Sequence, residues 1–594
     1  MRSSSSHLDW LKDRIDITRV PFSDRGSRLL IFQAPGKSRL ELKLAERLTE
    51  LQPGLDAYRR RPPFVHEISL LDGEGEPLEF ETVTYPHVLH FNTRVGEFGL
   101  VFQDHHTIVF RLPPHVTAGL RFHVSPQFWG RTERGGVFKA VRDLVYFTDG
   151  EPILNRITPK DGGYVVELLV KADGDCAVAL SAHRTPSVPD QVPSFSAAYA
   201  AAEKRWTDWF GRIPAVDERF YPTYAYAWWI MANNLISPHG KVTYEAMVPS
   251  KLNYVGLWLW DSALHAVAYR HVDPELARNQ IRAMLTWQSP NGMLPDAVHD
   301  EGVVTEIDHP IHAEVTKPPI LAWAALKLHE TAPDLDFLRE IYLPLVRWNA
   351  WWFSMNDDDA DGLVQYNHPY SSGLDDSPLW DYGLPVESPD LNTYLCLQME
   401  SLAAMAEILG MDAEAAMWCR RSKAIVRRMM RDFWDEEAGL FLALHEEKPI
   451  SVTTPFNLYP LWTGRLPDKI RDRLIGHLTD EEKFWAQYPL PTVARDDPHF
   501  DPETMWRGPV WANINYFFVE ALHRVGEDDL ARTLRERTLE LVMAQPSIYE
   551  YYNPESGEPP ATAANAFGWT SAVFIDLAIQ ASREEEGTTP GEVL

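Results

Sequence analysis

Cysteine is scarce in this chain of 594 residues, and its scarcity excludes several kinds of site. The three cysteines, Cys176, Cys396 and Cys419, are too few for a disulfide framework and form no CxxC pair that could bind a metal. We expect these cysteines to behave as small buried apolar residues, in a protein of a reducing compartment. Walker, GxGxxG and Ser-His-Asp patterns are missing as well.

Long apolar runs are also missing. No stretch of about 18 apolar residues occurs, so we expect no membrane-spanning segment and no membrane partner. The first residues, MRSSSSHLDWLKDR, show no apolar run after the basic residue. We therefore expect no secretory signal and a cytoplasmic protein.

Positive charge is outnumbered, with 56 Lys and Arg against 85 Asp and Glu, which gives a net charge of −29. A surface this acidic repels nucleic acid and anionic membranes, so neither is an expected partner. Hydrophobic residues make up 45% of the chain, which excludes disorder as its main state. The length predicts two or three domains, while the oligomeric state stays open.

Aromatic residues are abundant, with 21 Trp, 22 Tyr and 26 Phe. Many of them stand beside Asp, Glu, Arg and Pro in the later two-thirds of the chain. Flat apolar rings next to hydrogen-bonding side chains suit a sugar, but a large core filled with aromatic residues would have the same composition.

Residues 1–185 read as an antiparallel β-sandwich domain. Turn signals separate short β-rich runs at 64–71, 88–91, 107–112, 119–124 and 164–170. Nothing in this segment indicates catalysis, so we interpret it as a structural or substrate-shaping module.

Three prolines in PSVPDQVP open a linker, residues 186–217, that contains a helix over 196–210. Residues 218–583 form a helical domain of about ten to twelve helices, and 584–594 form a solvated tail. The clearest helix spans 389–409. The others cover roughly 220–238, 261–287, 318–331, 335–354, 412–433, 467–478, 508–525, 528–544 and 566–582. Periodicity alone leaves a solenoid or a toroid open.

Two carboxylates far apart in the chain suit hydrolysis of a glycosidic bond. Asp375 follows Gly373 in a turn and could hold a proton as the acid, while Glu550, flanked by tyrosines, could be the base or the nucleophile. Such a pair can give inversion or retention of the anomeric configuration. A capping Asp and a solvated Glu are about equally consistent with the residues alone.

Six ordered motifs resemble glycoside hydrolase family 63: WDSALH, NGMLP, SSGLDDSPLWD, YPLPTVARDDPHF, MWRGPVWANINY and EYYNPESGE. The resemblance covers about residues 195–583. The chain is also similar, more distantly, to trehalases. The family resemblance implies an (α/α)6 toroid, an inverting mechanism and, in larger members, an N-terminal β-sandwich.

By motif, the resemblance makes Asp375 the general acid and Glu550 the general base, with Asp376 and Glu555 as their main rivals. The substrate-binding residues that we expect from the same motifs are Trp260, Asp261, Asp296, Lys317, Trp506, Arg507 and Trp511. The match at Asp296 is weaker, and Lys317 stands before two prolines as a plausible further contact. For Arg507 a structural ion pair is the alternative, and for each Trp it is packing between loops.

No metal or cofactor is expected. Asp357, Asp359, Asp361 and Gly362 imitate the start of an EF-hand, but His368 stands where the loop needs a bidentate Glu. A polar turn is the better interpretation, although a bound cation stays open. The cluster of His299, His309 and His312 lacks the spacing of a helical zinc site.

The leading hypothesis is an inverting, exo-acting α-glycosidase, and specifically an α-glucosidase that acts on a small soluble α-glucoside. The first alternative is hydrolysis of mannosylglycerate or glucosylglycerate, where Lys317 and Arg507 could bind the carboxylate of the leaving group. Two further hypotheses are a non-catalytic carbohydrate-binding toroid and a sugar epimerase. The N-terminal segment counts against the glycerate hydrolases, because those relatives are typically shorter.

Overall fold

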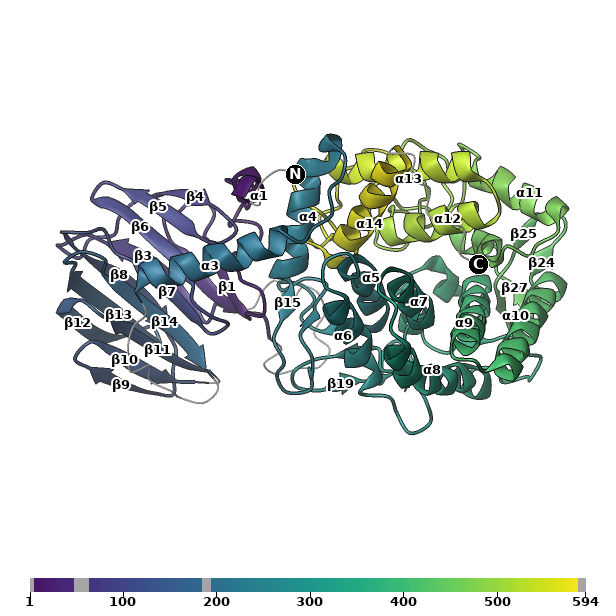
Figure 1. The fold of residues 1–594 in the computed structure, drawn as a ribbon, viewed down its shortest axis with the longest axis horizontal. Coiled ribbons are helices and arrows are strands. Elements are labelled where there is room, and N and C mark those ends of the chain that lie inside the picture. The colour runs from purple at the N-terminus through teal and green to yellow at the C-terminus, as the bar shows by residue number, and fades with distance from the viewer. Residues whose placement is uncertain (1–4, 47–62, 141, 184–193, 586–594) are drawn as a thin grey trace. The chain divides into compact units, whose positions relative to one another are not determined.

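The computed structural model describes residues 5–46, 63–140, 142–183 and 194–585 (Figure 1). These residues divide into two compact units. The first unit holds the described residues up to Ile213, together with Trp228–Ser237 and Ser250–Val255. The second unit holds Pro214–Ala227, Pro238–Pro249 and the described residues from Gly256 onward. The proline-rich start of the predicted linker and most of the predicted tail lie outside the described residues.

The first unit contains two antiparallel sheets, as the sequence predicts. The order is β1-β2-β3-β8-β13-β12 in the six-stranded sheet and β4-β5-β6-β7-β14-β11-β10-β9 in the eight-stranded sheet. The strands are β1 (Leu29–Gln33), β2 (Leu40–Leu44), β3 (Val65–Leu71), β4 (Glu81–Thr84), β5 (Leu89–Thr93), β6 (Gly96–Phe102), β7 (Thr107–Arg111), β8 (Thr117–Val124), β9 (Phe128–Thr132), β10 (Gly135–Lys139), β11 (Asp143–Thr148), β12 (Glu151–Lys160), β13 (Gly163–Lys171) and β14 (Ala177–His183). A short helix, α1 (Ser5–Trp10), precedes them.

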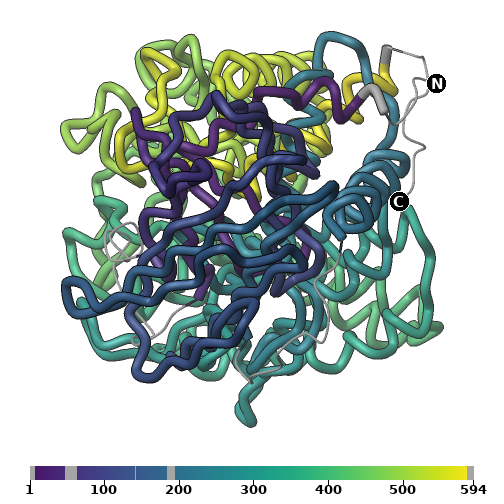
Figure 2. The backbone as a smooth tube through the Cα atoms, turned by 90° about the vertical axis from the view of Figure 1, so that its left-hand side faces the viewer, coloured from purple at the N-terminus to yellow at the C-terminus, as the bar shows by residue number. Residues whose placement is uncertain are grey.

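Side chains from the two sheets contact each other in the first unit. The ring of Phe122 on β8 meets that of Tyr146 on β11 edge to face, with centroids 5.5 Å apart. The Tyr146 hydroxyl donates to Oδ1 of Asn155 on β12 at 2.7 Å. In Figure 2 the strands of this unit, coloured purple to blue, run side by side. The sheets therefore share a core that includes aromatic side chains.

Helix α3 (Phe195–Phe210) bears out the helix predicted over 196–210 and packs against the eight-stranded sheet. Ser194 is its N-cap, because the Ala197 N–H donates to the Ser194 hydroxyl at 3.2 Å. Phe195 packs against Val101 and Val109 of the sheet. The helix thus belongs to the first unit's core.

The second unit is helical. Its helices are α5 (Leu259–Tyr269), α6 (Pro274–Leu285), α7 (Leu321–Thr331), α8 (Leu335–Met355), α9 (Pro389–Ile408), α10 (Asp412–Asp432), α11 (Asp468–Leu478), α12 (Ala512–Arg524), α13 (Asp528–Met543) and α14 (Gly568–Glu585). Helix α4 (Tyr221–Asn233) begins in this unit. The 3-10 helices are η1 (Glu218–Phe220), η2 (Pro369–Ser372), η3 (Pro378–Tyr382) and η4 (Pro455–Thr463). None of the described helices is long and apolar enough to cross a membrane.

Short two-residue strands lie in the connections of the helical region. They are β15 (Leu235–Ile236), β16 (Ala246–Met247), β17 (Leu257–Trp258), β18 (Ala297–Val298), β19 (Val303–Val304), β20 (Glu306–Ile307), β21 (Ala313–Glu314), β22 (Gln365–Tyr366), β23 (Val386–Glu387), β24 (Trp434–Asp435), β25 (Leu440–Phe441), β26 (Leu444–His445) and β27 (Lys448–Pro449). Their lengths explain why no strand alternation is visible in the sequence.

Six elements of the second unit contact one another in a closed series. Helix α5 contacts α7, α7 contacts α9, α9 contacts η4, η4 contacts α12, α12 contacts α14, and α14 contacts α5. Further helices pack beside this series: α6 contacts α5, α10 contacts α9, α11 contacts η4 and α13 contacts α12. The helical character predicted for this part of the chain is confirmed.

One prediction about the helices was wrong, and one helical segment was missed. The single helix predicted over 261–287 is two helices, because Asp273 caps the start of α6 and Pro274 occupies its first turn. The η4 segment was not predicted as a helix. Pro455 and Pro460 stand within it and break the α-helical pattern, and it forms a 3-10 helix instead.

The expectation of buried cysteines holds for Cys176 and Cys396, whereas Cys419 is exposed.

A buried ion-pair network joins α14, α12 and the residues that directly follow α5. Asp576 on α14 accepts hydrogen bonds from Arg270 at 2.8 Å and from the Tyr516 hydroxyl on α12 at 2.6 Å. His271 Nε2 lies 2.7 Å from the same carboxylate. Burial opposes the charge of Asp576, but Arg270 and His271 outweigh burial and hold the pKa of the carboxyl well below its ordinary range.

Asp576→Asn should lower the free energy of unfolding by about 3–5 kcal/mol, because it leaves the Arg270 guanidinium buried without its counter-charge. The folded-state pKa is depressed, so this contribution is present above the unfolded pKa of about 4 and declines as pH falls below it. Urea unfolding measures the effect. Asp208→Asn, in an exposed pair with Lys204, is the control and should change stability by less than about 0.5 kcal/mol. An equal effect of the two variants would contradict the conclusion that the buried Asp576 network stabilises the fold.

Candidate active site

Asp375 lies on a short loop that packs against the first turn of α5. The loop follows η2, and the Leu374 N–H donates to Oγ of Ser372 at 2.9 Å. Gly373 has φ of 75°, a left-handed conformation that glycine adopts at no steric cost. A Cβ on Gly373 would lie 2.3 Å from Cζ2 of Trp260. Glycine at this position therefore allows the Trp260 ring to approach the loop that carries Asp375.

Lys317 lies buried between the Asp375 loop and Asp296. Its Nζ is 2.6 Å from Oδ1 of Asp296, and the two side chains are 5% and 6% exposed. Lys317 also donates a hydrogen bond to the backbone carbonyl of Tyr370 in η2. The cation therefore joins an acidic side chain to the backbone of the Asp375 loop.

Strand pairing places Asp296 beside the start of α5. Trp258 of β17 pairs with Ala297 of β18, and the Leu259 N–H donates to the Asp296 carbonyl at 3.1 Å. Trp260 and Asp261 follow directly in the first turn of α5. The WDSALH and NGMLP motifs, separated in sequence by about 30 residues, thus meet here.

Burial raises the pKa of Asp375 to about 7, and the neighbouring carboxylates of Asp296 and Asp376 add to the shift, while Lys317 opposes it. Oδ1 of Asp375 is buried and has no hydrogen-bond partner among the described residues. A carboxyl with this pKa keeps its proton at a pH where ordinary Asp side chains are ionised. Asp375 can therefore act as a proton donor near neutral pH.

Glu550 is 2% exposed and lies in a segment that backbone hydrogen bonds hold in place. Its N–H donates to the Ala564 carbonyl at 2.9 Å, and the Ala564 N–H donates to Glu550 Oε2 at 3.1 Å. Tyr552 and Val510 exchange backbone hydrogen bonds of 2.7 and 3.0 Å. The EYYNP and WRGPVW motifs therefore lie side by side.

Asp261 links the surroundings of Glu550 to those of Asp375. Burial raises the pKa of Asp261 well above its ordinary value, and the charges of Glu550 and Asp296 add to the shift, while Lys317 opposes it. Lys317 interacts in turn with both Asp375 and Asp261. Charges shift one another's pKa this way when they are near neighbours. A chain of interacting charges, through Lys317 and Asp261, thus runs from Asp375 to Glu550.

A cluster of aromatic rings connects the same segments. Trp506 and Trp511 stack with centroids 3.7 Å apart, and Trp260 lies 6.1 Å from Trp506. Tyr551, next to Glu550, lies 4.7 Å from Trp511, and Trp569 contacts both Trp260 and Trp511. Trp506 and Trp511 are 0% exposed, so packing accounts for much of their surface. Their direct contact with a sugar stays a prediction.

Arg507 forms a bidentate ion pair with Asp381. Nη1 donates to Oδ2 at 2.9 Å and Nη2 to Oδ1 at 2.7 Å. The hydrogen bonds from Arg507 to Asp381 lead the interactions that raise the pKa of the guanidinium, against a smaller effect of burial. The ion-pair alternative considered for Arg507 thus describes its geometry, and its role as a substrate ligand stays a prediction.

The rival carboxylates have other surroundings. Asp376 accepts the Trp506 N–H at 2.9 Å and so holds the loop over 505–511. Burial raises the pKa of Asp376, but the Trp506 N–H and the Arg507 charge oppose the shift. Glu555 has a side chain that is 54% exposed and lies 3.7 Å from Arg495. Asp376 therefore already uses its carboxylate in a hydrogen bond, and Glu555 lies in solvent.

The structure brings the nine predicted site residues into one neighbourhood of the second unit, and it adds partners that the sequence did not reveal. Asp381, Trp569, the Ala564 N–H and the Tyr370 carbonyl each contact at least one of the predicted residues. Asp381 stands inside the SSGLDDSPLWD motif, so a signal existed for it. Trp569 and the two backbone groups carried no pattern from which the contact could be predicted.

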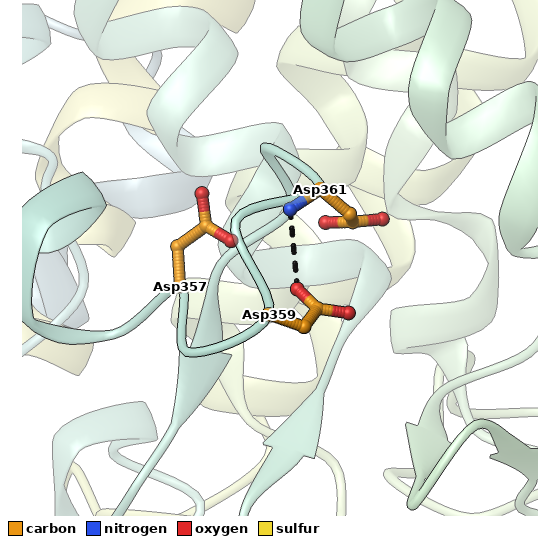
Figure 3. Close-up of side chains that lie close together, drawn as sticks. All are labelled: Asp357, Asp359 and Asp361. Atoms are coloured by element: carbon orange, nitrogen blue, oxygen red, sulfur yellow. Dashed lines mark hydrogen bonds between the residues drawn. The ribbon is translucent and has the colours of Figure 1, made fainter.

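The turn over 357–361 carries three aspartates whose side chains lie close together (Figure 3). One oxygen from each of Asp357, Asp359 and Asp361 lies within 4.8 Å of the others. The Asp361 N–H donates to Oδ1 of Asp359 at 3.2 Å, as expected of a polar turn. Burial and the nearby aspartates raise the pKa of Glu387 to about 7. This is the one group of potential metal ligands among the described residues, and it does not include the histidines considered above.

A cavity of about 470 Å³ lies in the first unit rather than at these residues. Apolar side chains such as Phe64, Phe138 and Leu144 line much of it. None of the predicted site residues contributes to its lining. A large cavity alone would thus have pointed away from the carboxyl groups.

Most glycoside hydrolases act through two carboxyl groups, and this region holds several carboxyl groups together with a cluster of tryptophan rings. A family model described as the mannosylglycerate hydrolase MGH1-like glycoside hydrolase domain matches residues 254–570, more than half of the chain. The chain belongs to this family, and the resemblance to glycoside hydrolase family 63 is confirmed.

Comparison with individual proteins agrees with this assignment. The mannosylglycerate hydrolase of Thermus thermophilus is 28% identical over 403 residues, which cover 55% of this chain and 95% of that protein. A solved GH63 mannosylglycerate hydrolase of Thermus thermophilus, in complex with glucose, has a TM-score of 0.52 at 25% identity, covering 59% of this chain and 98% of that one. A bacterial glucoamylase with acarbose covers 96% of this chain and 95% of its own, with a TM-score of 0.60 at 10% identity, which shows a shared fold alone.

Proposed function

We propose that this protein hydrolyses an O-glycosidic bond with inversion, using Asp375 as general acid and Glu550 as general base. The observation that carries the proposal is the pair itself. Asp375 is a carboxyl with a pKa raised to about 7, and Glu550 is a buried carboxylate in a fixed segment. Asp375 interacts with Lys317, Glu550 interacts with Asp261, and Lys317 and Asp261 interact with each other.

In the proposed reaction the Asp375 carboxyl donates its proton to the leaving oxygen while the bond to the anomeric carbon breaks. Glu550 accepts a proton from the water that attacks the opposite face of the sugar. Inverting enzymes hold the two carboxyls about 6.5–9.5 Å apart, which leaves room for this water. We assign the sugar in the cleaved position to Trp260, Asp261 and Asp296. Lys317, Trp506, Arg507 and Trp511 complete the proposed binding site.

We assign this chemistry to an (α/α)6 toroid over residues 218–583. The closed series of α5, α7, α9, η4, α12 and α14, with other helices packed beside it, supports a toroid over a solenoid. In the same proposal, residues 1–185 form a β-sandwich, and α3, which the sequence placed in the linker over 186–217, packs against its eight-stranded sheet.

For the substrate, the comparisons favour a glycosyl glycerate over the plain α-glucoside that the sequence predicted. The Thermus thermophilus relative is named a mannosylglycerate hydrolase, and the alignment spans 95% of it. We therefore propose a small glycoside such as mannosylglycerate or glucosylglycerate as the first candidate.

A neutral α-glucoside is the second candidate, because both cations expected to bind a glycerate carboxylate already have partners. Lys317 is paired with Asp296, and Arg507 is paired with Asp381 through two hydrogen bonds. An anionic leaving group would have to compete with these carboxylates or be held by hydrogen bonds alone.

A matched pair of substrates separates the two candidates. α-Glucosylglycerate and α-glucosylglycerol differ by one carboxylate, and mannosylglycerate tests the sugar. The proposal predicts release of free sugar, measured by chromatography, with a higher kcat/KM for the glycerate. A higher kcat/KM for glucosylglycerol would favour the neutral candidate. Binding without turnover, or an isomerised product without hydrolysis, would reject hydrolysis itself.

The pKa of Asp375 sets the alkaline limit of activity. The acid must be protonated to work, so kcat/KM should be retained below about pH 7 and fall as pH rises through that value. The base must be ionised, so activity should also fall on the acidic side. A pH profile of kcat/KM measures both limits. Activity that stays constant between pH 6 and 9 would contradict the role of Asp375.

A further inference from the structure

Lys317 is a buried lysine with its charge fully engaged. It is 4% exposed, its Nζ lies 2.6 Å from Oδ1 of Asp296, and it donates to the Tyr370 carbonyl. A buried ammonium is costly unless carboxylates and hydrogen bonds surround it. Here burial opposes the charge, but Asp296, Asp375 and Asp261 outweigh burial and raise the pKa of Lys317. The side chain therefore stays charged at neutral pH.

The contacts of Lys317 connect two segments that are otherwise distant in the chain. Asp296 belongs to the segment that pairs with the start of α5, and Tyr370 belongs to the 3-10 helix five residues before Asp375. A neighbouring contact strengthens the second connection, because the Thr316 N–H donates to Oγ of Ser371 at 3.3 Å. Lys317 and Thr316 thus hold η2 from the same side.

Several charged and titratable groups face Lys317, and they come from every segment packed around it. On the α5 side lie Asp261 and Asp296, and on the acid loop lies Asp375, with Asp376 beside it. Glu550 acts on the same set through Asp261. The remaining neighbours in η2 and just before it are Tyr370 and His368.

We propose that Lys317 is a positioning residue that acts on Asp375 through η2: its ion pair with Asp296 and its hydrogen bond to the Tyr370 carbonyl fix the loop carrying the acid against the start of α5. This inference rests on the proposed function only for its effect on catalysis. The immobilisation of the loop can be tested without any substrate.

Hydrogen–deuterium exchange tests the immobilisation directly. Lys317→Met keeps a long apolar stem and removes the charge and the hydrogen bonds, so amides over 369–376 should exchange faster than in the wild type. The control is Lys327→Met, ten residues further on, which removes a lysine paired with Glu520 at 2.9 Å. It should leave exchange over 369–376 unchanged. Equal exchange in all three proteins would overturn the proposal.

Kinetics test the consequence for the acid. A loop displaced by about 1 Å can lower the rate on the order of 10²-fold, so Lys317→Met should lower kcat by about that factor. The cation opposes the raised pKa of Asp375, so its loss should move the alkaline limit of the pH profile to higher pH. A lysine that only fills space would leave that limit in place.

A double variant keeps the test decisive if Lys317→Met folds poorly. Lys317→Gln combined with Asp296→Asn removes both charges and keeps hydrogen-bonding groups, so the combined loss should be smaller than the product of the single losses. Independent, multiplicative losses would overturn the ion-pair role. If the wild type hydrolyses no glycoside, the proposed function fails, while the exchange experiment still decides the positioning role.

Discussion

Asp375→Asn is expected to lower kcat on a natural glycoside by about 10²–10⁴-fold, the range that general acid catalysis contributes. The asparagine amide has nearly the shape of the carboxyl but no proton to give to the leaving oxygen. The buried Oδ1 atom and the pKa of about 7 are the features that suit Asp375 to this task. Steady-state kinetics with a small natural glycoside measure the loss.

The choice of leaving group separates a loss of proton donation from a loss of folding. A glycosyl fluoride needs little protonation of its leaving group, so Asp375→Asn should retain much more of the wild-type rate on the fluoride than on the natural substrate. Asp376→Asn is the matched control, because its amide oxygen can still accept the Trp506 N–H. It should lose less than about tenfold. A larger loss in Asp376→Asn than in Asp375→Asn would exchange the two roles.

Glu550→Gln is expected to lower kcat by a similar factor of about 10²–10⁴, and on every substrate. The attacking water needs a base whatever the leaving group is, so the glycosyl fluoride should not restore activity. The variant can retain the bond from the Ala564 N–H to the side chain, which limits structural change. The combined pattern, with fluoride turnover kept in one variant and lost in the other, identifies acid and base separately.

Glu555→Gln is the matched control for Glu550→Gln. Its exposed side chain lies next to Arg495 in solvent, and an exposed ion pair contributes little. The variant should keep a rate within about twofold of the wild type, because removing a solvated pair changes little else. Loss of activity in Glu555→Gln with retention in Glu550→Gln would overturn the assignment of the base.

The sequence predicted the helices best where local chemistry is strong. Pro389 at the first position and an apolar repeat mark α9, and the observed helix ends one residue before the predicted limit. The break between α5 and α6 depends on Asp273 and Pro274, two signals inside an otherwise continuous apolar pattern. The 3-10 helix η4, a member of the closed series, contains two prolines, which hide its helical character in the sequence. Its place in the series depends on contacts with α9 and α12, and no local sequence pattern encodes those contacts.

The same limit applies to the site. Asp375 and Glu550 stand in long motifs and could be named from the sequence. Their surroundings come from contacts across long separations, such as the 130 residues between Asp376 and Trp506 or the 126 between Asp381 and Arg507. Periodicity and composition report on neighbours in the chain, so these pairings were not predictable. The charge on Lys317 was visible in the sequence, but its pairing with Asp296 was not.

The configuration of the first product tests the central claim most directly. Proton NMR during early hydrolysis of an α-linked substrate should show the β-anomer of the released sugar first, before mutarotation mixes the two forms. This result requires attack by water on the face opposite the leaving group, with Asp375 and Glu550 on opposite sides of the bond. Initial release of the α-anomer would mean retention and would contradict the assignment of Glu550 as a base acting on water.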